Sequence, residues 1–114
     1  MIILKGVDPK MIANNLTPSE PIHPGEMIKD EIEYRGVSQR KLAKQMGISP
    51  TLLNEILNGK RAVSTEYALL FEAALGIPAE IWLRQQHRYD MQVAKSNKTF
   101  LERLAQVRKL AAAL

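Results

Sequence analysis

The chain has 114 residues, of which 46% are hydrophobic and only 5% aromatic, a size and composition that suit a single domain of packed helices. It contains no cysteine, which excludes disulfides and thiolate metal sites and favours a cytoplasmic location. No apolar run approaches the roughly 18 residues that a membrane-spanning helix needs, so a soluble protein without membrane contact is expected.

Residues 1–22 are expected to form an arm ahead of the folded domain. Xaa-Pro steps at Pro9, Pro18 and Pro21 interrupt this segment. Because proline lacks a backbone N–H and restricts the preceding residue, they leave room for at most a short helical turn from Pro9 to about Asn14.

A first helix is predicted from the sequence HPGE at 23–26 to Gly36. Pro24 suits the first turn of a helix, where its missing N–H is no loss, and the glycine at the end supplies a left-handed stop. Carboxylates near the start complement the positive end of the helix dipole. The predicted apolar face consists of Met27, Ile28, Ile32 and either Tyr34 or Arg35.

Two short helices with a tight connection follow. Ser38 is a good N-cap for the first of them, predicted over 39–46, and Gly47 ends it. Ser49 caps the second, and Pro50 occupies its first position. The predicted inward-facing side chains are Leu42, Ala43, Met46, Leu53, Ile56 and Leu57.

A fourth helix is predicted from the Ser64 cap to Gly76, and a fifth from Pro78 to about Lys95. Serine and glycine again mark the ends, as in the preceding pair of helices. The apolar side of the fifth helix is predicted to carry Ile81, Trp82, Tyr89 and Val93.

The final segment, 99–114, has a heptad-like apolar stripe that is too short to be called a coiled coil. The favoured interpretation is a helix that folds back onto the core, and the alternative is a helix that binds a partner. The stripe consists of Phe100, Leu104, Val107, Ala111 and Leu114.

The two tightly joined helices within 38–61 are typical of a helix-turn-helix, whose first helix crosses the phosphate backbone and whose second enters the major groove. Ser49, Thr51 and Asn54 are short polar side chains suited to contacts with base edges. Gln39, beside the free N–H groups at a helix start, is predicted to contact phosphate. Each residue has an ordinary structural alternative, as a cap or a solvated surface residue, so DNA binding is predicted from their combination.

Charge is unevenly distributed along the chain. Residues 1–34 hold three lysines against six carboxylates, a net −3, whereas residues 35–61 hold six cations against one carboxylate, a net +5. A basic patch of this kind favours a polyanionic partner, although a scattered, solvated surface would have the same composition. Further phosphate contacts are predicted from this stretch at Arg40, Lys44, Lys60 and Arg61.

The stretch SQRKLAKQMGISPTLLNEILNGKRAVS resembles the phage-repressor (Cro/C1, or XRE) class of helix-turn-helix. Together with HPGEMIKDEI before it and ALLFEAALGIPAEIWLRQQHRYD after it, it resembles the HigA (VapI-like) antitoxins, over about 21–90. This resemblance implies a dimeric, lambda-repressor-like domain of five helices. It also implies repression of the protein's own operon and neutralisation of a co-encoded HigB toxin, a RelE-like ribonuclease.

The resemblance also implies contacts at particular positions. The groove-facing positions of the family match Ser49, Pro50, Thr51 and Asn54, and its phosphate positions match Gln39, Asn58, Lys60 and Arg61. Pro50 departs from the pattern, because many relatives have a polar residue there and proline cannot donate a hydrogen bond.

No catalytic residues are predicted, and the protein is not expected to be an enzyme. Only His23 and His87 are present, and His23 with Glu26 is the nearest approach to a metal-binding pair, so neither a metal nor a cofactor is expected. Trp82 and Tyr89 lie at core spacing away from the basic stretch, which predicts core or dimer packing rather than base stacking.

The sequence therefore predicts an all-α protein: an N-terminal arm (1–22), a five-helix DNA-binding and dimerisation domain (23–95) and an additional C-terminal helix (96–114). A homodimer formed through the fourth and fifth helices is expected to bind a palindromic operator with half-sites about one helical turn apart. Toxin contacts are expected in the arm, the C-terminal helix or both. The alternatives are a stand-alone repressor and a helical interaction module that does not bind DNA.

Overall fold

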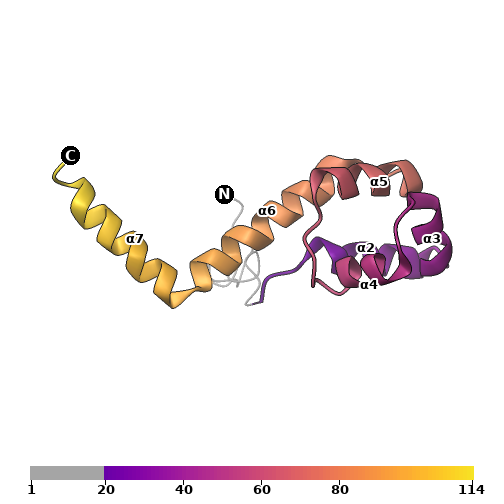
Figure 1. Cartoon of the computed structure of the whole chain (residues 1–114), viewed down its shortest axis with the longest axis horizontal. Helices are drawn as coiled ribbons and strands as arrows, with labels where there is room; N and C mark the ends of the chain where they lie inside the picture. Colours follow the sequence, from indigo (N-terminus) through magenta and orange to yellow (C-terminus); the bar gives the residue numbers. More distant parts are fainter. Residues whose placement is uncertain (1–19) are drawn as a thin grey trace, which may run out of the picture.

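The computed structural model describes residues 20–114, and over this range the chain forms six α-helices and no β-strand (Figure 1). This confirms the predicted all-helical, helix-turn-helix fold. The predicted turn near Pro9, and all of the arm before residue 20, lie outside the described residues. The helices are α2 (Pro24–Tyr34), α3 (Gln39–Met46), α4 (Pro50–Leu57), α5 (Thr65–Leu75), α6 (Ala79–Ser96) and α7 (Lys98–Ala111).

Serine and glycine set the ends of the central helices, as predicted. The Oγ of Ser49 accepts a hydrogen bond from the N–H of Leu52 at 3.0 Å, and the Oγ of Ser64 accepts one from the N–H of Tyr67 at 3.2 Å. Gly47 ends α3 in the left-handed region, with a φ of +70° that side-chain-bearing residues rarely adopt. These boundaries are therefore set by residues only a few positions apart.

The core lies among α2 to α5 and the first half of α6. α2 packs against α4 and α6, and α5 packs against α3 and α6. Arg35 ties the end of α2 to the end of α5, because its guanidinium donates to the carbonyl oxygen of Leu75 at 2.7 Å and to the carboxylate of Glu31 at 2.8 Å. The fully buried side chains include Phe71, Ile28, Ile32, Leu42, Leu53, Ile56, Leu57 and Val63.

Two positions of the predicted apolar face of the first helix are wrong. Met27 is 37% exposed and Tyr34 is 89% exposed. Ile28 and Ile32 define the buried side of α2, and the other two side chains lie roughly 120° around the helix from it. The outer side of α2 therefore carries apolar groups that the single domain does not bury.

The apolar side predicted for the fifth helix is only partly buried in α6. Trp82 is in the core, but Ile81 and Val93 are exposed. Ile81 lies off the buried side, whereas Val93 is on the same side as Trp82 but further along a helix that continues past the end of the core (Figure 1). Periodicity predicted which side of the helix is apolar, but it did not predict at which residue the core stops covering that side.

The predicted return of the last helix onto the core is wrong. α7 packs against α6 at their junction and then projects away from the core, and none of its residues is buried (Figure 1). Only Asn97, whose Oδ1 accepts a hydrogen bond from the N–H of Phe100 at 3.1 Å, separates the two helices, so there is no loop to reverse the chain. The helix ends at Ala111, which leaves Leu114 outside it. No described helix is long and apolar enough to cross a membrane.

A buried histidine joins the start of α2 to α6. His23 is 2% exposed, its Nδ1 accepts a hydrogen bond from the N–H of Gly25 at 2.9 Å, and its ring meets that of Tyr89 edge-on at a centroid distance of 4.9 Å. The Nε2 atom is buried without a hydrogen-bond partner among residues 20–114. Desolvation lowers the pKa of His23 below its ordinary value of 6.5, although the carboxylates of Glu26 and Asp90 act in the opposite direction.

We expect the free energy of unfolding to decrease as the pH falls below 6.5, the ordinary pKa of this side chain. Because the folded-state pKa of His23 is lowered, the unfolded chain takes up the proton first. The stabilising contribution is therefore complete above this pH and is lost toward the lower folded-state pKa, by at most about 1.4 kcal/mol per pH unit.

Urea unfolding at about pH 7.5 and about pH 5 measures this loss. His23→Asn is the control, because it keeps a side-chain acceptor for the helix cap but cannot titrate. The wild-type protein should lose more stability than the variant between the two pH values, and equal losses would contradict the assignment to His23.

Candidate DNA interface

α3, a three-residue turn and α4 form a rigid unit. Ile48 in the turn is half-buried against the core, and its N–H donates a hydrogen bond to the carbonyl oxygen of Ala43 at 3.0 Å. The inner side of α4 is fixed by buried Leu53, Ile56 and Leu57. Its opposite side faces solvent and brings together the predicted base-contacting residues, all exposed: Ser49, Pro50, Thr51 and Asn54.

The two asparagines of this region differ in their side-chain hydrogen bonds within residues 20–114. The side-chain amide of Asn54 makes no hydrogen bond within the described part of the chain. Asn58 donates from Nδ2 to the carbonyl oxygen of Asn54 at 2.8 Å, and its Oδ1 accepts a hydrogen bond from the Nζ of Lys29 at 3.4 Å. A phosphate could still accept the second amide hydrogen of Asn58, but these local bonds restrict the orientation of its side chain, so Asn54 is the less constrained of the two amides.

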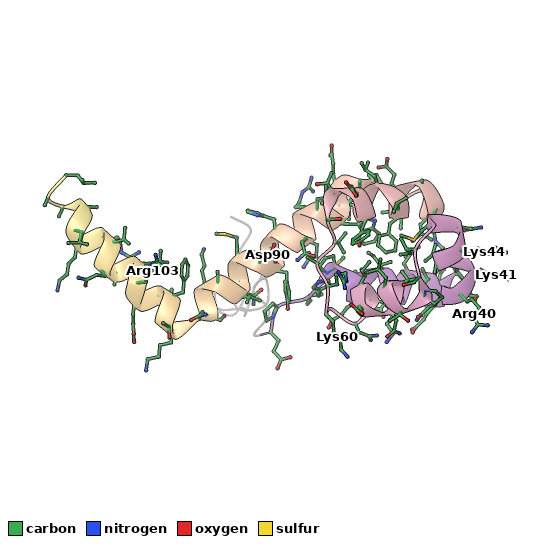
Figure 2. All side chains as sticks on the ribbon, viewed as in Figure 1. Arg40, Lys41, Lys44, Lys60, Asp90 and Arg103 are labelled. Atoms are coloured by element: carbon green, nitrogen blue, oxygen red, sulfur yellow. The ribbon has the colours of Figure 1, made fainter. Side chains whose placement is uncertain are left out.

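Cations lie along both ends of this exposed surface. Figure 2 shows Arg40 on α3 and Lys60 just beyond α4 at the same lower edge of the view, with Lys44 higher on α3. All three are exposed, and Gln39 is half-buried at the first position of α3. The sequence prediction did not include Lys41, which is also exposed and lies between the other α3 cations in Figure 2. Its position within the basic stretch 35–61 is the sequence feature that could have added it to the predicted phosphate contacts.

An ion pair modifies the role predicted for Arg61. Its Nη2 and Nε atoms donate to the Oε2 of Glu55 at 2.9 and 3.1 Å. Glu55 is the carboxylate of α4, one residue from Asn54, and would repel DNA if it were unpaired. Arg61 therefore neutralises a charge on α4, in addition to the phosphate contact predicted for it.

The remaining predicted residues lie elsewhere. Trp82 is 4% exposed in the core, and Tyr89 is half-buried against His23, so neither ring is available to stack on a base. His23 caps α2 through Nδ1, and residues 20–114 contain no cluster of three or more histidine, aspartate or glutamate side chains suited to a metal ion.

A short helix fixed over a core, with small polar residues outward and cations at both ends, defines a helix-turn-helix DNA-binding domain. Comparison with known proteins agrees, since residues 28–82 match the helix-turn-helix family. The chain is 36% identical over 78 residues to virulence-associated protein I of Dichelobacter nodosus, an alignment that spans 68% of this chain and 72% of the relative.

Solved structures identify the family more closely. An addiction module antidote protein of the HigA family from Coxiella burnetii is 35% identical, with a TM-score of 0.65 over 73% of this chain and 94% of that one. The Pseudomonas aeruginosa antitoxin HigA, solved with the higBA promoter, is 28% identical, with a TM-score of 0.64 over 68% of this chain and 85% of that one. The chain belongs to the HigA family of helix-turn-helix DNA-binding antitoxins. The family is not enzymatic, which confirms the expectation from the sequence.

Proposed function

We propose that this protein is the antitoxin and autorepressor of a toxin-antitoxin operon in the cytoplasm. In this proposal a homodimer binds a palindromic operator through α3 and α4, and it also neutralises a co-encoded, RelE-like HigB ribonuclease. Residues 23–95 provide DNA binding and dimerisation, while the toxin contacts lie in the arm (1–22), the C-terminal segment (96–114) or both.

The exposed side of α4 is the main structural support for the proposal that the protein binds DNA. Thr51 and Asn54 are exposed, on a helix whose other side is held by the core, so base contacts would need no rearrangement of the backbone. Asparagine bonds bidentately to adenine, and threonine offers a hydroxyl and a methyl group for thymine. The Pseudomonas aeruginosa relative, solved with promoter DNA, supports the same use of the fold.

We expect Asn54→Ala to weaken operator binding by about 1–3 kcal/mol and to have much less effect on random DNA. The unpaired side-chain amide contributes to base recognition but to no hydrogen bond of the described structure, so the variant should fold normally. Fluorescence anisotropy with operator and scrambled duplexes measures both affinities. Equal losses on the two duplexes would contradict a role in base recognition.

The proposed dimer contact lies on α5 and α6. Leu69 on α5 is 52% exposed and Ile81 on α6 is 41% exposed, which leaves apolar groups for a second copy to cover. A two-fold dimer places two recognition helices on half-sites about 34 Å apart, one turn of B-DNA.

The proposal that the protein neutralises a co-encoded toxin is tested by the composition of the native complex. A native mass spectrum of the tagged protein, purified from its own host after nuclease and high-salt treatment, should contain a second, small subunit. That subunit should inhibit translation when it is released from the complex. A homodimer without a second subunit would favour the stand-alone repressor.

A further inference from the structure

The outward side of α7 is an amphipathic surface. Phe100 is 40% exposed, Val107 is 54% exposed, and no residue of the helix is buried. With successive residues about 100° apart, Arg103 and Arg108 flank the apolar stripe on opposite sides. A helix of this length is only marginally stable in water without a packing partner. The exposed apolar stripe of α7 therefore indicates that this helix packs against a partner surface.

The outer side of α2 is complementary to it. The partly exposed Met27 and the exposed Tyr34 lie seven residues apart, hence on the same side, and exposed carboxylates lie beside them. α2 holds four carboxylates and one lysine, a net −3, whereas α7 holds four cations and one carboxylate, a net +3. α7 points away from the α2 of its own chain (Figure 1). The exposed carboxylates of α2 are Glu26, Asp30 and Glu33.

We infer that α7 of one protomer packs on the outer side of α2 of a second copy of this chain. The inference rests on the homodimer proposed above. It adds a second contact between the protomers to the one proposed on α5 and α6. The apolar stripe of α7 covers Met27 and Tyr34, while Arg103 and Arg108 approach the α2 carboxylates. Two-fold symmetry forms the contact twice. Pairing α7 with α7 would instead bring together two helices of net charge +3.

Single cysteines report on this contact, because the natural chain contains none. Met27→Cys and Val107→Cys chains, tagged to differ in mass, are co-expressed and treated with a short bismaleimide. We expect a covalent dimer that contains one chain of each kind. Lys41→Cys, exposed on α3, replaces Met27→Cys as the control and should remain uncoupled. Coupling of Val107→Cys only to itself, or equal coupling to the control, would overturn the inference.

Charge exchange tests the same contact without a cross-link. Arg103→Glu with Arg108→Glu should raise the dimer dissociation constant about tenfold in sedimentation equilibrium, and adding Asp30→Lys with Glu33→Lys should restore it. A dimer unaffected by the first pair would overturn the α7 contact and leave the homodimer standing. A chain that stays monomeric at every concentration would overturn both. Binding to a half-site duplex, measured in parallel, tests DNA recognition independently.

Discussion

Gly25→Ala should lower the free energy of unfolding by about 3 kcal/mol or more, a large effect for the addition of one methyl group. Gly25 is in the first turn of α2, against α4. A Cβ at this position would overlap the carbonyl oxygen of Ile56, lie 2.8 Å from its carbonyl carbon and lie 2.9 Å from the Nδ1 of His23. Backbone atoms inside a helix cannot rotate aside as a flexible side chain can, so α2 and α4 would have to move apart.

Thermal unfolding followed by circular dichroism measures the loss. In a domain of this size 1 kcal/mol corresponds to about 4–8 °C, so a decrease in Tm of about 12–24 °C is expected. Gly47→Ala is the matched control, because its φ of +70° strains an alanine while the space around it is open, which limits the loss to about 1–2 kcal/mol. A Gly25→Ala variant at least as stable as Gly47→Ala would contradict the close packing of α2 on α4.

Removal of two cations beside α4 should flatten the salt dependence of operator binding. Arg40 and Lys60 are exposed at the same edge of the interface and make no ion pair in the described structure (Figure 2). If each contacts a phosphate, Arg40→Ala with Lys60→Ala should reduce the slope of log K against log salt by about 1.8 units for one protomer on a half-site duplex, 0.9 for each contact. Arg61→Ala alone should change the slope less than Lys60→Ala, because Arg61 is already paired with Glu55.

The control removes the same charge from a distant helix. Arg103→Ala with Lys109→Ala takes two cations from α7, which projects away from the interface (Figures 1 and 2). Measured on a half-site duplex, so that dimerisation does not contribute, this pair should leave the slope unchanged. Equal flattening by both pairs would show that the slope reports net charge alone and would reject the assignment of phosphate contacts.

Local signals in the sequence determined the helix-turn-helix. The cap at Ser49 is a hydrogen bond between residues three positions apart, and the left-handed stop at Gly47 is a property of a single residue. The outward position of Asn54 followed from helical periodicity, because buried neighbours on the same short helix leave only one side free. Such features depend on short stretches of chain and can be predicted without a tertiary structure.

Only the tertiary structure determined which elements pack against each helix surface and which surfaces stay exposed. By local propensity, alanine suits a helix better than glycine, yet Gly25 is required because α4 lies against it. The pairing of Arg61 with Glu55 and the exposure of Val93 beyond the core likewise depend on how the elements are placed. The apolar stripe of α7 was predicted correctly from Phe100 to Ala111, but Leu114 lies outside the helix and the direction of the helix was not predicted. Periodicity shows which side of a helix is apolar, whereas contacts between elements distant in the chain determine what covers it.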